Sequence, residues 1–79
     1  RLRAGFPTTW LSGDKTGTGM HETMPTKYND IAIVWPSYTA PGFVLATFYD
    51  GDGTQGVFRR EDEKVLKSVG ERCAQYYGV

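Results

Sequence analysis

The sequence predicts an α+β fold in which antiparallel strands form a small sheet and one C-terminal helix packs against it. Two apolar segments bounded by turn residues, NDIAIVWP at 29–36 and FVLATFYD at 43–50, are typical of strands. From about Arg59 to Tyr77 the apolar residues recur at steps of three and four, as an amphipathic helix requires. With 79 residues, the chain holds one domain or part of one.

The remaining segments follow in chain order. Residues 1–9, with Gly5 and Pro7, read as an irregular loop. WLSGDKTGTG, residues 10–19, reads as a strand that its glycines weaken, which is typical of a place where something approaches the backbone closely. MHETMPTKY, residues 20–28, contains a proline and no periodicity, so we expect a loop between strands. The apolar face of the helix comprises Val65, Leu66, Val69, Cys73, Ala74 and Tyr77.

Both faces of the predicted sheet are apolar. In the strand 31–35, Ile31, Ile33 and Trp35 lie on one side, whereas Ala32 and Val34 lie on the other. The second strand has the same character, which is typical of strands covered on both faces. One helix can cover one face only, and an uncovered apolar face would be a liability. We therefore expect further polypeptide to complete the sheet.

Composition excludes several classes of protein. Nine basic and nine acidic side chains cancel, which argues against a general affinity for nucleic acid or an anionic membrane. A single cysteine, Cys73, excludes an internal disulfide, and with the lone His21 it cannot build a zinc site, so no metal or cofactor is expected. The chain starts at Arg1 with neither methionine nor signal peptide, so we expect a processed segment.

The stretch GDKTGTG concentrates a cation, two hydroxyls and little side-chain bulk. On an extended strand Thr16 and Thr18 share one side, and Lys15 shares the other with Gly17. Two hydroxyls beside an ammonium group suit a bound carboxylate. The glycines let a ligand approach the backbone, where a free N–H could donate to a developing oxyanion. The residues of this stretch alone are equally consistent with a solvent-exposed edge of a hairpin that binds no ligand.

Other residues invite a functional reading that we do not favour. Asp50, Asp52, Thr54 and Glu61 have the spacing of a calcium loop, but Gln55 replaces the required glycine, so a turn is the better interpretation. Several further groups are assigned structural or solvated roles: Cys73, Trp10 and Trp35 in the core, and the pair His21–Glu22 and the helix start 59–64 in solvent.

The ordered set RLRAGFPTTW, DKTGTG, NDIAIVWP and PGFVLATFY resembles the C-terminal segment of class A serine β-lactamases, in the superfamily that includes penicillin-binding proteins. The resemblance covers nearly the whole chain. It implies an α-β-α sandwich in which residues 1–79 are part of the α/β domain, incomplete alone. It also implies an exported, periplasmic or secreted, enzyme that hydrolyses β-lactams through an acyl-serine.

The resemblance implies roles for individual residues. Lys15 would organise the cleft electrostatically, and the backbone N–H of Thr18 would form half of the oxyanion hole. The hydroxyls of Thr16 and Thr18 would bind the substrate carboxylate, which Arg1 would neutralise. Two glycines would keep the strand accessible: Gly17 and Gly19.

The chain lacks Ser-x-x-Lys, Ser-Asp-Asn and a general-base glutamate, so we predict that it is inactive alone and needs the remaining β-lactamase polypeptide as its partner. The loop predicted at 20–28 would influence which β-lactams fit. Alternatives are a fragment of a penicillin-binding D-Ala-D-Ala peptidase, a calcium-binding module and an inert partner domain that reuses the fold.

Overall fold

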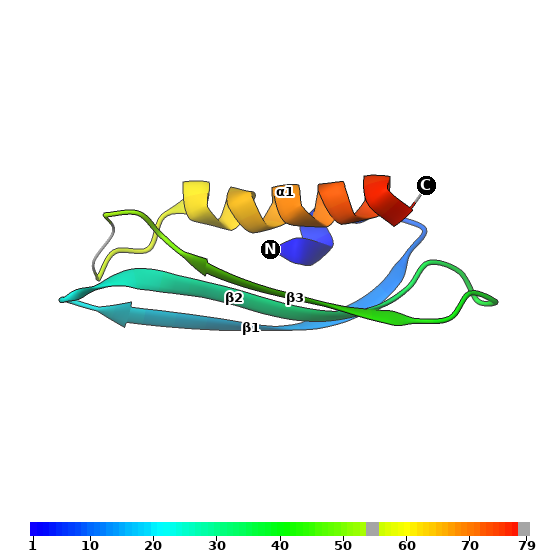
Figure 1. Ribbon diagram of the computed structural model, residues 1–79, viewed down its shortest axis with the longest axis horizontal. Coiled ribbons are helices and arrows are strands. Elements are labelled where there is room, and N and C mark those ends of the chain that lie inside the picture. Colours follow the sequence, from blue (N-terminus) through cyan, green and yellow to red (C-terminus); the bar gives the residue numbers. More distant parts are fainter. Residues whose placement is uncertain (54–55, 78–79) are drawn as a thin grey trace.

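A computed structural model describes residues 1–53 and 56–77, and it has two layers (Figure 1). The strands pair antiparallel in the order β1-β2-β3, and α1 lies over one face of the sheet with the short helix η1 between them. The predicted α+β fold is therefore confirmed. In chain order the elements are η1 (Leu2–Gly5), β1 (Leu11–His21), β2 (Met24–Trp35), β3 (Phe43–Asp50) and α1 (Arg60–Tyr77).

The prediction of a loop at 20–28 is wrong, because β1 and β2 both extend into this segment. β1 extends to His21, and β2 begins at Met24. The register shifts between Gly19 and His21, which marks a β-bulge close to the turn. Pro25 interrupted the sequence pattern, yet a proline is tolerated near the start of a strand. Thr23 closes the turn, since its backbone N–H lies 3.2 Å from His21 Nδ1.

Residues 1–9 are more regular than predicted, because Leu2–Gly5 forms a 3₁₀ turn that lies directly against α1. Two glycines allow this close approach. A Cβ added to Gly70 would lie 2.2 Å from the carbonyl oxygen of Leu2, and one added to Gly5 would lie 2.1 Å from that of Lys67. The glycine in the middle of α1 therefore serves helix packing, which outweighs its poor helix propensity.

The hydrophobic core lies between the sheet and the two helices. Trp10 is buried as predicted, and its ring packs edge-on against Phe43 and Tyr77. Trp35, predicted to be a core residue, instead lies on the opposite face and is 39% exposed. Both faces of this sheet are apolar, so the sequence pattern could not show which face α1 would cover. The buried cluster comprises Leu2, Phe6, Trp10, Ala32, Val34 and Ala74.

Helix α1 buries only part of the predicted apolar face: Leu66 and Ala74 are buried and Cys73 is half-buried, whereas Val65 and Tyr77 are exposed. Burial raises the pKa of the Cys73 thiol, which favours its less reactive protonated form. The helix start was predicted to be solvated, but Asp62 is buried and Glu63 is half-buried in an ion pair with Arg1. No helix in the described ranges is both long and apolar enough to cross a bilayer.

The face of the sheet opposite α1 carries large apolar side chains in contact with solvent. Phe48 is 73% exposed and Val44 65% exposed, and their neighbours in the register continue the surface. The prediction that one face of the described sheet lacks a covering layer is therefore confirmed. We call this surface the open face; it comprises Leu11, Ile31, Ile33, Trp35, Val44 and Phe48.

Candidate functional site

The Lys-Thr-Gly stretch lies on β1, an edge strand of the described sheet, and every residue from Lys15 to Gly19 is exposed. An edge strand leaves alternate backbone N–H and C=O groups without a strand partner. Thr18 pairs with buried Tyr28 and therefore faces α1, whereas Lys15 pairs with Ile31 on the open face. The predicted alternation of Lys15 and the threonines is thus confirmed.

Lys15 borders a shallow hollow on the open face, lined also by Gly13, Ile31 and Ile33 among others. Its Nζ donates a hydrogen bond to the carbonyl oxygen of Thr16 at 2.8 Å. This contact holds the ammonium group against its own strand. Lys15 itself is exposed, on the face of β1 opposite to Thr18.

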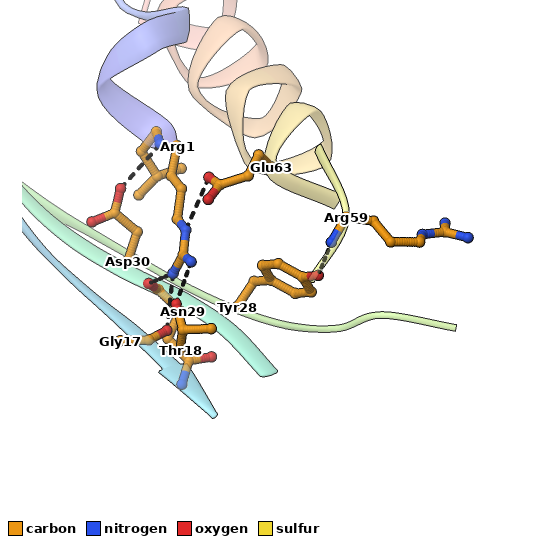
Figure 2. A network of polar contacts seen from close by, with 9 residues as sticks. Arg1, Gly17, Thr18, Tyr28, Asn29, Asp30, Arg59 and Glu63 are labelled. Atoms are coloured by element: carbon orange, nitrogen blue, oxygen red, sulfur yellow. Dashed lines mark hydrogen bonds and ion pairs between the residues drawn. The ribbon is translucent and has the colours of Figure 1, made fainter. Parts of the chain in front are cut away.

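Arg1, the residue before η1, reaches this strand with its side chain (Figure 2), which is only 5% exposed. Its Nε donates to Glu63 Oε2 at 3.0 Å, and its Nη1 donates to the carbonyl oxygens of Gly17 and Asn29 at 2.9 Å each. Its Nη2 donates to the Thr18 hydroxyl. Four of the five guanidinium N–H donors are thus engaged, which leaves one for a ligand.

A second polar cluster supports the site from within the protein. Asp30 is fully buried, and its Oδ2 accepts a hydrogen bond from the backbone N–H of Leu2 at 3.0 Å, whereas Oδ1 accepts none from a described residue. Burial raises the pKa of Asp30, the neighbouring Asp14 carboxyl raises it further, and the Leu2 N–H opposes the shift. A negative charge on Asp14 disfavours a second negative charge on Asp30, so the folded protein holds the Asp30 proton more tightly.

This raised pKa predicts how stability depends on pH. Because the folded protein holds the Asp30 proton more tightly than the unfolded chain, the contribution of Asp30 to the free energy of unfolding is complete below the ordinary value of 3.8 and is lost as pH rises through the raised pKa. Asp30→Asn, which keeps an oxygen for the Leu2 N–H, should flatten that fall. Urea unfolding between about pH 4 and pH 7 measures it. Exposed Asp52→Asn is the control, and an unchanged slope in Asp30→Asn would contradict the assignment.

The structure brings together some of the predicted site residues and adds others. Arg1, Gly17 and Thr18 are in contact, whereas Lys15 lies on the opposite side of the strand. Thr16 shares the face of Thr18, and Gly19 adjoins the bulge. Sequence analysis missed three participants, since their partners are distant along the chain: Tyr28, Asn29 and Glu63.

The calcium interpretation gains no support from the described residues. Asp50 is engaged by Lys27, whose Nζ lies 2.9 Å from Asp50 Oδ2. Thr54 and Gln55 lie outside the described residues. Within residues 1–53 and 56–77, no three histidine, cysteine or acidic side chains group closely enough to hold a metal ion.

Comparisons with known proteins point to one family, although no family model matches the chain. The chain is 43% identical over 74 residues to the β-lactamase Toho-2 of Escherichia coli, and 49% identical over 49 residues to β-lactamase 1 of Bacillus cereus. These alignments cover 94% and 62% of this chain but only 23% and 15% of the relatives. The chain thus spans about a quarter or less of the curated relatives that it matches.

Solved structures agree with the sequence comparison. A β-lactamase from Desulfarculus baarsii matches with a TM-score of 0.78 and 33% identity, over 100% of this chain and 27% of that one. An ancestral class A β-lactamase matches with a TM-score of 0.72 and 36% identity, over 96% of this chain and 26% of that one. The architecture is therefore a segment of the β-lactamase fold. The predicted resemblance to part of a class A β-lactamase is confirmed.

Proposed function

We propose that residues 1–79 form the substrate-carboxylate side of a class A serine β-lactamase, which opens the β-lactam amide through an acyl-serine and then hydrolyses that ester. The observation that carries the proposal is the Arg1 guanidinium, which four hydrogen bonds hold against β1 beside Thr18. The likeness to β-lactamases in sequence and fold supports the same assignment.

The anionic group of the substrate would be bound by the hydroxyls of Thr16 and Thr18 and by the remaining Arg1 donor, a set that we call the carboxylate wall. Hydrogen bonds between ionised partners are about twice as strong as neutral ones. The backbone N–H of Thr18 would donate to the oxyanion that develops on the β-lactam carbonyl. Lys15, on the other side of β1, would act on groups that pack over the open face.

Those groups belong to the partner that the proposal requires. The chain has no serine–lysine pair of the required kind and no general-base glutamate, so nucleophile, proton transfer and deacylation must come from the remaining β-lactamase polypeptide. The open face suits such a partner, because its apolar side chains gain stability only when other apolar groups cover them.

A chimera tests the proposal. Residues 1–79 replace the matching segment of the Escherichia coli Toho-2 relative, and hydrolysis of a chromogenic cephalosporin is followed by absorbance. We expect the chimera to turn over the substrate and the purified 79-residue chain not to do so. Turnover by the chain alone would refute the division of roles, and a folded but inactive chimera would refute the function.

Glu63 offers a test of the electrostatics of the carboxylate wall. Its carboxylate neutralises Arg1, so Glu63→Gln should leave an acceptor for Arg1 Nε while making the site more positive by one charge. Binding of an anionic substrate should tighten by about threefold to tenfold, as expected for one added charge at several ångströms. The KM of a penicillin measures it in the chimera. Glu61→Gln, on a 73% exposed side chain, is the matched control and should change nothing.

A further inference from the structure

Tyr28 has no role in the proposed chemistry, yet it lies directly beneath the Arg1 guanidinium. Its side chain is fully buried, and it faces Thr18 across the β1–β2 register. The Arg1 Cζ lies 5.3 Å from the centre of the Tyr28 ring. Within about 6 Å, the negative face of an aromatic ring attracts a guanidinium. The Arg1 guanidinium therefore packs over the face of the Tyr28 ring while it contacts Thr18.

The hydroxyl of Tyr28 serves a second element of the same network (Figure 2). The backbone N–H of Arg59 donates to Tyr28 Oη at 2.9 Å, and Arg59 immediately precedes α1. Glu63, which accepts from Arg1 Nε, lies in the first turn of that helix. One side chain thus contacts the arginine through its ring and fixes the start of the helix that supplies the counter-ion.

Neighbouring rings hold Tyr28 in this orientation. Its ring centre lies 5.4 Å from that of Phe58 and 6.1 Å from that of Tyr49, both in tilted arrangements. These separations are typical of favourable aromatic pairs. Since the ring is fully buried between them, it cannot turn away from Arg1 without disturbing the packing.

We propose that Tyr28 is a positioning residue: its ring holds the Arg1 guanidinium beside Thr18 and thereby sets the preference of the site for ligands that carry a carboxylate. An aliphatic side chain in its place is smaller and offers no negative ring face. The inference rests on the proposed function, in which Arg1 forms part of the carboxylate wall.

Paired substrates test the role in the chimera. We measure kcat and KM for a penicillin and for its methyl ester, which lacks the negative charge. Tyr28→Leu should lower kcat/KM for the acid about tenfold relative to the ester, mainly through KM, as the loss of one cation–π contact implies. Tyr28→Phe keeps the ring and should keep the ratio within about twofold. Tyr49→Phe, which removes a hydroxyl from the same aromatic cluster, is the matched control and should leave the ratio unchanged.

Each outcome separates the inference from the proposed function. If Arg1→Ala lowers the acid-to-ester ratio and Tyr28→Leu does not, the positioning role is refuted while the carboxylate wall stands. If Tyr28→Leu lowers kcat/KM equally for the acid and the ester, Tyr28 is only a packing residue and the inference is likewise refuted. If Arg1→Ala leaves the ratio unchanged, the carboxylate wall itself is refuted. Should Tyr28→Leu fail to fold, Tyr28→Met, a flexible side chain that adapts to the same space, is judged by the same criteria.

Discussion

Replacing Lys15 by alanine in the chimera should lower kcat/KM for a β-lactam by about 10²- to 10³-fold, the usual cost of removing one preorganised electrostatic group from an active site. Lys15 Nζ lies against the strand, held by the carbonyl of Thr16, on the face that the partner polypeptide would cover. Excluding water there strengthens its field on the reacting groups. Steady-state hydrolysis of a chromogenic cephalosporin measures the loss.

The reason for this loss can be checked with two further variants. Lys15→Arg keeps the positive charge and should recover part of the activity, but not all of it, because a planar guanidinium does not reproduce the compact ammonium group. Lys64→Ala removes an exposed lysine from α1 and should leave activity unchanged. A Lys15→Ala chimera that retains full activity would show that this lysine is a solvated edge residue.

Gly70→Ala should destabilise the protein by ~3 kcal/mol, at the upper end of the cost of overpacking a core. Alanine favours a helix over glycine by about 1 kcal/mol, so propensity alone predicts the opposite sign. The added Cβ, however, would lie 2.2 Å from the Leu2 carbonyl oxygen, so the backbones of α1 and η1 must separate. Urea unfolding of the chimera measures the change.

This separation would also reach the candidate site. Arg1 immediately precedes η1, so moving that turn displaces the guanidinium from Thr18, and activity on carboxylate-bearing substrates should fall together with stability. Ser68→Ala, a substitution on the exposed side of the same helix, should be neutral or slightly stabilising. Equal or higher stability of Gly70→Ala would mean that α1 does not approach η1 as closely as described.

Local patterns were enough to predict the elements that carry the site. The alternation that places Lys15 and Thr16 on opposite sides of β1 depends only on the two-residue period of a strand, which the sequence shows directly. The helix from Arg60 follows in the same way from its three- and four-residue spacing. The apolar character of both sheet faces likewise predicted that one of them lacks a cover.

Contacts between distant residues could not be predicted this way. Glu63 looked like a solvated acid in the first helical turn, yet its partner, Arg1, is 62 residues away. Trp35 was assigned to the core because both faces of the sheet are apolar, so the sequence pattern does not distinguish the buried face from the exposed one. Only the position of α1 shows which face is covered. The tip of the hairpin was missed because strand pairing outweighs the local signal of Pro25.

The shift of register between Gly19 and His21 lies at the tip of the β1–β2 hairpin, beyond Thr18. Pairing is continuous from Leu11 to Gly19, so the orientation of Thr18 is set on the sheet side of the irregularity. A slip of one position in a strand inverts every side chain beyond it, but here an odd insertion can be absorbed at the tip. An insertion or deletion at this tip would therefore change the turn without changing the side of β1 on which Thr16 and Thr18 lie.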